Sequence, residues 1–267
     1  MALVQLKDFK MHYLEQGTGS EPIIFVHGFI STGVWWQPAL KHLPASFRAY
    51  TVDLRACGES ERIDTNHTLA QYADDLHQFV EQMGLQQFIL VGHSMGGAVA
   101  MQYALNHQDR LKTLVLVDPM AAFGTRISPE ITAWINAQQS NAEGIRQIIL
   151  GAFATPPTGA YLEKLVEDGT RWDKPIYLGT IDDMAQFNIS DRLPEITVPT
   201  LLTWGDKDTV IPFAAIVDIF TKIPGCALEV WHGVGHSGPI EIPGRFVELL
   251  TSFIHEAELT HSTAQAS

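Results

Sequence analysis

Three short segments of this sequence carry residue types that could perform nucleophilic catalysis. Residues 92–96 read Gly-His-Ser-Met-Gly, residues 205–208 read Gly-Asp-Lys-Asp, and residues 233–236 read Gly-Val-Gly-His. A serine hydroxyl is a poor nucleophile until a neighbouring base takes its proton, and a neutral imidazole can do so near pH 7. A carboxylate then fixes the tautomer of the imidazole and stabilises its protonated form. Such a set could transfer an acyl group to Ser94.

Each segment directly follows an apolar run that is typical of a buried strand. Such runs lie at 23–26, 50–52, 88–91, 114–117, 201–204 and 228–231. Helical patterns alternate with them at 69–83, 96–106, 213–222 and 243–258, and segment 9–14 is expected to add an antiparallel edge strand. This alternation predicts an α/β fold with a mostly parallel sheet flanked by helices. Since open α/β sheets carry their sites past the carboxyl ends of strands, the three segments should meet at one edge.

The segment around Ser94 has the setting of a nucleophile elbow. It lies between the apolar run 88–91 and a helical pattern, and its small flanking residues suit a strained turn that raises the serine above the sheet. A G-x-S-x-G pattern alone also fits an ordinary glycine-rich turn. The other two segments, in their order along the chain, favour the catalytic interpretation.

Together these motifs make the sequence similar to the α/β-hydrolase fold superfamily, from Phe9 to the last helical pattern. The motifs that carry the resemblance are His-Gly-Phe at 27–29, Asp-Leu-Arg at 53–55, G-x-S-x-G at 92–96, G-x-x-D at 205–208 and Gly-His at 235–236. The sequence departs from the family at Ala56, where D-x-R-G-x-G-x-S usually has glycine. That departure concerns the turn after Arg55 and none of the three catalytic positions.

The resemblance implies a role for each matching residue. Ser94 would be the nucleophile, His236 the general base and then the general acid, and Asp208 the carboxylate that orients His236. The backbone N–H groups of Phe29 and Met95 would form the oxyanion hole. The resemblance requires no cofactor, and no set of His, Cys, Asp or Glu has the spacing of a metal site.

Other residues compete for two of these roles. Asp206 and Asp118 are alternatives to Asp208, although the family places its acid at the last residue of G-x-x-D, so Asp206 would shape the turn. His232 is the close competitor of His236. His93, beside the serine, is interpreted as a packing or hydrogen-bonding residue.

The strand pattern stops between residues 119 and 198. Four helical patterns, 129–139, 142–153, 161–168 and 176–187, fill this segment and predict a helical cap inserted into the core. The core would then comprise 1–118 and 199–258, and the small polar tail 259–267 is expected to be disordered.

Aromatic residues after the oxyanion segment and within the cap predict an apolar substrate pocket. The alternative is that these rings form the core of the cap itself. The candidates for substrate binding are Trp35, Trp36, Phe123, Trp134, Phe153 and Tyr177.

Among hydrolases of this superfamily, the motif residues favour cleavage of a carboxylic ester or lactone. Epoxide hydrolases and haloalkane dehalogenases have Asp at the position of Ser94. Carbon–carbon bond hydrolases typically have Asn where this chain has His93, and perhydrolases and haloperoxidases usually have Pro where it has Ile30. These last two activities remain alternatives, as does a small-molecule receptor that retains the triad.

Composition excludes several partners. The chain has 267 residues and a formal net charge of -13, which disfavours nucleic acids and anionic membranes as partners. No apolar run is long enough to span a bilayer, and no signal segment is evident, so we expect a soluble cytoplasmic enzyme that acts on a small molecule. The two cysteines, Cys57 and Cys226, suggest neither a disulfide framework nor a zinc site.

Overall fold

The core of the fold is an eight-stranded sheet with the order β1-β2-β4-β3-β5-β6-β7-β8. The computed structural model describes residues 2–124, 133, 137–138 and 141–265. Strand β2 pairs antiparallel with β1 and β4, and all other neighbouring strands are parallel. The strands are β1 Ala2–Gln5, β2 Lys10–Gln16, β3 Glu21–Val26, β4 Phe47–Val52, β5 Phe88–His93, β6 Leu111–Val117, β7 Thr200–Gly205 and β8 Ala227–Trp231. The predicted parallel sheet with its antiparallel edge is therefore confirmed.

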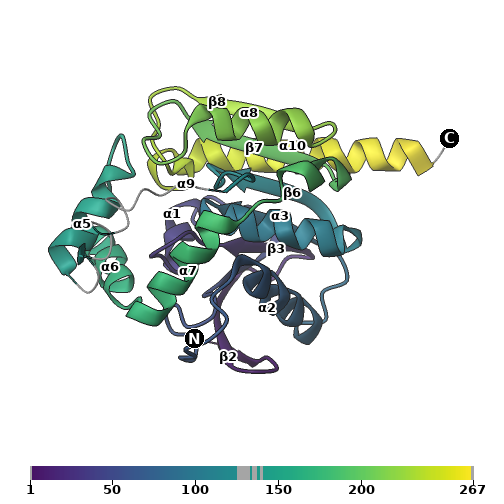
Figure 1. Cartoon of the computed structure of the whole chain (residues 1–267). Coiled ribbons are helices and arrows are strands. Elements are labelled where there is room, and N and C mark those ends of the chain that lie inside the picture. The colour runs from purple at the N-terminus through teal and green to yellow at the C-terminus, as the bar shows by residue number, and fades with distance from the viewer. Residues whose placement is uncertain (1, 125–132, 134–136, 139–140, 266–267) are drawn as a thin grey trace.

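Helices cover the sheet and account for the apolar runs in its central strands (Figure 1). Every residue of β5 is buried, as expected of a strand with packed layers on both faces. Helix α2 packs against α3, whereas α10 packs against α1 and α9. Their bounds are α1 Gln37–Leu40, α2 Leu69–Gln82, α3 Met95–His107, α8 Phe213–Lys222, α9 Gly238–Glu241 and α10 Pro243–Gln265.

The segment between β6 and β7 contains the expected helices. They are α5 Ala142–Gly151, α6 Gly159–Thr170 and α7 Lys174–Gln186, followed by the 3-10 helix η3 Ser190–Glu195. Helices α5 and α6 lie to one side of the sheet (Figure 1), whereas α7 contacts α2, and η3 contacts α3 and α8. Each of the first three overlaps a helical pattern in the sequence, while the pattern at 129–139 falls mostly outside the described residues.

The last helix is longer than the sequence indicated. Helix α10 continues from Pro243 to Gln265, so residues 259–265 are helical rather than a disordered tail. Its last turns extend beyond the body of the molecule (Figure 1). The residues Ala257, Glu258 and Leu259 are good helix formers, so a helix already begun can propagate through them without a buried face. None of the described helices is both long and apolar enough to traverse a bilayer.

The turn after β4 forms even though it lacks one of the usual glycines. Ala56 has a φ of 60°, in the left-handed region that favours glycine, which explains the family's preference at this position. Arg55 anchors the turn, because its guanidinium makes two hydrogen bonds of 2.7 Å to the buried carboxylate of Asp75. A buried bidentate contact of this kind fixes the geometry of the turn despite the unfavourable backbone angle.

Candidate active site

Ser94 lies in a strained turn between β5 and α3. Its φ of 53° and ψ of -119° are rare for a residue with a side chain. Glycine is needed on both sides: a Cβ on Gly92 would lie 2.2 Å from the Gly96 carbonyl oxygen, and one on Gly96 would lie 2.4 Å from the Val26 carbonyl oxygen. The Ser94 N–H donates to Val117 of the neighbouring strand at 3.0 Å. The turn therefore has the geometry of the predicted nucleophile elbow.

The loops after β7 and β8 bring Asp208 and His236 together. The Nδ1–H of His236 donates to Oδ2 of Asp208 at 2.7 Å, and the Asp208 side chain is fully buried. Oδ1 of Asp208 accepts the backbone N–H groups of Val210 and Ile211 at 2.7 and 2.9 Å. Both carboxylate oxygens are thus occupied, and the carboxylate acts as a fixed acceptor for the imidazole.

The two competing residues form a separate pair on the surface. Nδ1 of His232 lies 2.6 Å from Oδ2 of Asp206, and the His232 side chain is almost fully exposed. Asp206 also accepts the Gly233 N–H at 2.7 Å. Asp206 therefore joins the loops after β7 and β8 from outside, as a residue that shapes the turn.

Asp118, at the end of β6, lies buried behind the Asp208–His236 pair. Its Oδ1 accepts the Gly205 N–H at 2.9 Å, and no described residue hydrogen-bonds to Oδ2. Burial, with the Asp208 charge adding to it, raises the pKa of Asp118 to about 8. Burial lowers the pKa of His236, but the charge and hydrogen bond of Asp208 outweigh that effect, so the pKa of His236 lies above its usual value.

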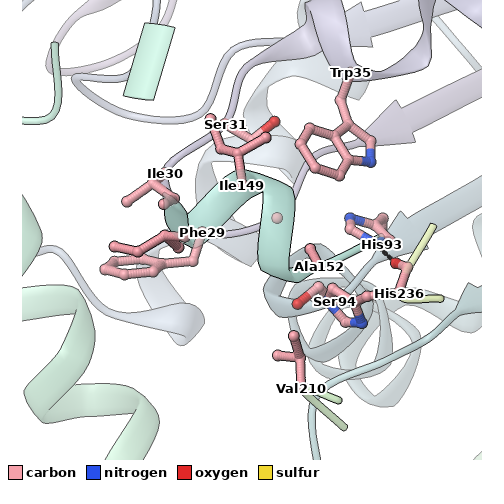
Figure 2. A pocket seen from close by; sticks show the side chains of 12 residues that line it. Phe29, Ile30, Ser31, Trp35, His93, Ser94, Ile149, Ala152, Val210 and His236 are labelled. Carbon is pink, nitrogen blue, oxygen red and sulfur yellow. Dashed lines mark hydrogen bonds between the residues drawn. The ribbon is translucent and has the colours of Figure 1, made fainter. Parts of the chain in front are cut away.

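His93 holds the loop of His236 in place through a hydrogen bond to its backbone. Its Nε2–H donates to the backbone carbonyl of His236 at 2.7 Å, shown as a dashed line in Figure 2. The ring stacks on Trp35 with a centroid distance of 5.2 Å, and burial holds the pKa of His93 well below its usual value. His93 is therefore a neutral donor that fixes the His236 loop, in agreement with its interpretation as a hydrogen-bonding residue.

Ser94 and His236 open into one small, mostly apolar pocket (Figure 2). Its volume is about 120 Å³. The loop after β3 supplies Gly28, Phe29, Ile30, Ser31 and Trp35, and the insertion supplies Ile148, Ile149 and Ala152. His93 and Val210 complete the lining.

The loop after β3 lies directly over Ser94. A Cβ on Gly28 would lie 3.1 Å from Cβ of Ser94, a tight contact, so this loop approaches the serine closely. Among the described residues, no acceptor bonds the N–H of Phe29 or that of Met95, the first residue of α3. Both N–H groups are therefore available as donors, which the predicted oxyanion hole requires.

The insertion holds this loop in place through buried hydrogen bonds. Oγ1 of Thr32 donates to Oδ2 of Asp168 in α6 at 2.8 Å. The indole N–H of Trp172 donates to the Ser31 carbonyl at 3.1 Å. Ile30, directly before Ser31, has a φ of 50°, which a proline could not adopt. The loop conformation thus differs from one that a proline at this position would impose.

Five of the six candidate aromatic residues lie in the part of the chain that the structure describes, and of these five only Trp35 lines the pocket. Phe153 stacks behind Trp35 at 5.6 Å, and Tyr177 packs on Phe29 at 4.9 Å, so both support lining residues without lining the pocket. Trp36 lies in the core against Phe25 and Phe246, Phe123 is 48% exposed on a loop, and Trp134 is outside the described residues.

The aliphatic residues that line the pocket were not predicted from the sequence motifs. Ile148, Ile149 and Ala152 belong to the predicted helix 142–153, but no motif marks the face of that helix that meets Ser94. Val210 could have been found from its position two residues after Asp208. Within the described ranges, no three His, Cys, Asp or Glu side chains are grouped as a metal site would require, and both cysteines are free thiols.

Comparison with known proteins defines the family. Residues 21–178 match the model of the alpha/beta hydrolase fold family, so the chain belongs to that family. Monoacylglycerol lipase abhd6-B of Xenopus laevis is 24% identical, over 95% of this chain and 81% of its own length. The pimeloyl-[acyl-carrier protein] methyl ester esterase of Vibrio vulnificus is 27% identical, over 91% and 97% respectively. The esterase EaEST from Exiguobacterium antarcticum is 25% identical with a TM-score of 0.86, covering 95% of this chain and 98% of that one.

Proposed function

We propose that this protein is a serine hydrolase that cleaves a carboxylic ester or lactone through an acyl-enzyme intermediate. The observation that carries the proposal is the convergence of Ser94 and His236 on one apolar pocket, with Asp208 hydrogen-bonded to the far side of the imidazole. The names of the relatives, which include an esterase and a lipase, agree with ester cleavage.

In the proposed first half-reaction, Nε2 of His236 takes the Ser94 proton while Oγ attacks the carbonyl carbon. The negative charge that develops on the carbonyl oxygen is stabilised by the N–H groups of Phe29 and Met95. Asp208 stabilises the imidazolium. When the tetrahedral intermediate collapses, His236 gives its proton to the leaving alkoxide, and the acyl group remains on Ser94.

In the second half-reaction, water replaces the alcohol. His236 takes a proton from the water as it attacks the acyl-enzyme, the same two N–H groups stabilise the second oxyanion, and Ser94 is released with its proton restored. The free acid then leaves. In this proposal, the insertion acts as a cap, because α5 closes the pocket and limits the access of bulk water to the acyl-enzyme.

The proposal is tested with two serines of the same pocket. A fluorophosphonate should label Ser94 alone, as read by peptide mass spectrometry, and Ser94→Ala should abolish release of p-nitrophenol from a short-chain ester. Ser31, which also lines the pocket, provides the matched control for labelling: the Ser31→Ala variant should still be labelled at Ser94. In a serine protease that uses the same kind of triad, loss of the nucleophile costs about a millionfold in kcat. Labelling at Ser31, or an active Ser94→Ala variant, would contradict the assignment.

The same assay separates an enzyme from a receptor that retains the triad. An enzyme releases many equivalents of p-nitrophenol per active site, whereas a receptor releases a single equivalent and stops. A single-turnover burst in wild type, with Ser94 left acylated, would overturn hydrolysis as the function.

A further inference from the structure

The end of helix α5 forms the pocket wall that faces the candidate nucleophile (Figure 2). Three residues make this wall: Ile148, Ile149 and Ala152. Ile149 and Ala152 are themselves buried. The size of the space beside Ser94 is therefore set by aliphatic side chains of the insertion.

Several contacts fasten this wall to the loop that carries His236. The His236 N–H donates to the Ala152 carbonyl, and a Cβ on Gly235 would lie 2.5 Å from the Ala154 nitrogen, so the two segments are in direct backbone contact. Glu241 connects them further, since its carboxylate accepts the N–H of Thr155 at 2.7 Å and that of Gly235 at 2.9 Å. The wall cannot withdraw without disturbing the position of His236, so the pocket has a fixed depth.

The pocket volume limits the group that can be held there. At about 120 Å³ it is slightly smaller than an apolar cavity of about 150 Å³ that accommodates benzene in another protein. A group of about six carbons is the upper limit. Among the described residues, the lining carries no charged side chain apart from the imidazole of His236, so a carboxylate or ammonium placed in the pocket would lose its hydration without gaining a partner from them.

The mouth of the pocket is at Val210. This residue lines the pocket and is 50% exposed, so it lies where the pocket meets solvent. A group directed past Val210 is not limited by the wall. If the acyl part of an ester enters the pocket and the alcohol part leaves past Val210, the wall restricts the size of the acyl part alone.

We propose that this protein is selective for esters of short, uncharged acyl groups, up to about six carbons, and that Ile149 and Ala152 set that limit. The proposal rests on the proposed ester hydrolysis and adds the substrate class. This selectivity would distinguish the protein from an enzyme that acts on long-chain lipids, because a long acyl chain would need the volume that α5 occupies.

The test is an acyl-length series of p-nitrophenyl esters from acetate to dodecanoate. In wild type, kcat/KM should be highest for acyl groups of two to six carbons and fall about tenfold or more at eight. The hemisuccinate should be hydrolysed about a hundredfold more slowly than the butyrate, which has the same number of carbons but no charge. Replacing p-nitrophenol by the larger 4-methylumbelliferone should leave the acyl preference unchanged.

Variants of the wall should shift the preference in opposite directions. Ile149→Ala removes part of the wall, and should raise kcat/KM for octanoate relative to acetate about tenfold. Ala152→Leu fills the pocket and should reduce hydrolysis of butyrate and hexanoate relative to acetate. Ile145→Ala is the matched control, because Ile145 is a buried isoleucine of α5 that does not line the pocket. Circular dichroism checks folding, and Ile149→Val gives a milder enlargement if Ile149→Ala is unstable.

The outcomes distinguish the two proposals. Ser94-dependent hydrolysis that is fastest for octanoate or dodecanoate would overturn the short-acyl selectivity and leave ester hydrolysis standing. Absence of Ser94-dependent hydrolysis at every length would overturn the proposed function itself. If Ile149→Ala and Ile145→Ala gave the same profile as wild type, α5 would not set the limit.

Discussion

Replacing Asp208 by asparagine should place the ring proton of His236 on the wrong nitrogen. Oδ1 of Asp208 already accepts the N–H groups of Val210 and Ile211, so the amide oxygen of the variant must stay there and its NH₂ must face His236. Nδ1 of His236 then has to accept a hydrogen bond from this NH₂ group, so the ring proton moves to Nε2. Nε2 is the atom that should take the proton of Ser94. The corresponding change in a serine protease lowers kcat about 10⁴-fold. We expect a loss of that order, about 5.5 kcal/mol of transition-state stabilisation.

The assay is kcat/KM for a short-chain p-nitrophenyl ester, with thermal melting to confirm that the variant folds. Asp206→Asn is the matched control, because Asp206 lies in the same loop but bonds His232 on the surface instead of His236. Its activity should stay within about threefold of wild type, since solvent screens exposed pairs. Equal losses in the two variants, or less than about a tenfold loss in Asp208→Asn, would refute the tautomer argument.

Three further predictions follow from the site. Activity should rise with pH through one ionisation above about 6.5, because His236 must be neutral to act as a base and its pKa is raised; full activity at pH 5 would contradict a histidine base. Thr32→Val breaks the bond to Asp168 and should lower kcat about tenfold with KM little changed, since it loosens the loop that carries an oxyanion donor; a change in KM alone would contradict this role. Asp118 has a raised pKa, so wild type loses stability as pH rises from about 4 to about 8. Asp118→Asn keeps an acceptor for the Gly205 N–H and should raise the free energy of unfolding by about 1–3 kcal/mol at pH 8, with little gain at pH 4; calorimetry that found no pH-dependent gain would contradict a protonated Asp118.

The residues that perform the proposed chemistry were predictable because their roles impose local sequence constraints. The turn at Ser94 admits only glycine at 92 and 96, and this requirement is written in the sequence as G-x-S-x-G. Parallel strands are buried on both faces, so their apolar runs stood out and placed Asp208 and His236 at the same edge as Ser94. Choosing Asp208 over Asp206 needed the family pattern, and the hydrogen bonds now show which carboxylate meets His236.

The pocket and the ends of the chain were less predictable because tertiary packing decides them. Trp35 and Trp36 are neighbours, yet one lines the pocket and the other is buried in the core, and no local pattern distinguishes them. The helix 142–153 was predicted, but the face it presents to Ser94 depends on how α5 docks. Strand β1 was missed because it has only four residues, too few to show the period of a strand in the sequence. Helix α10 was predicted too short because composition alone does not show where a helix ends.

The place of the insertion has a consequence for how the chain folds. The insertion separates β6 from β7, yet these strands are adjacent in the sheet, and Asp118 at the end of β6 bonds Gly205 at the end of β7. Closing so long a loop carries an entropic cost before any pairing compensates for it, so this step should be slow relative to formation of the β3–β5–β6 segment. During synthesis, the strained Ser94 turn can form on the ribosome well before the strands that carry Asp208 and His236 emerge. Under the proposed function, the nucleophile has no base until β7 and β8 are in place, so a chain that ends before β8 should show no hydrolysis of esters.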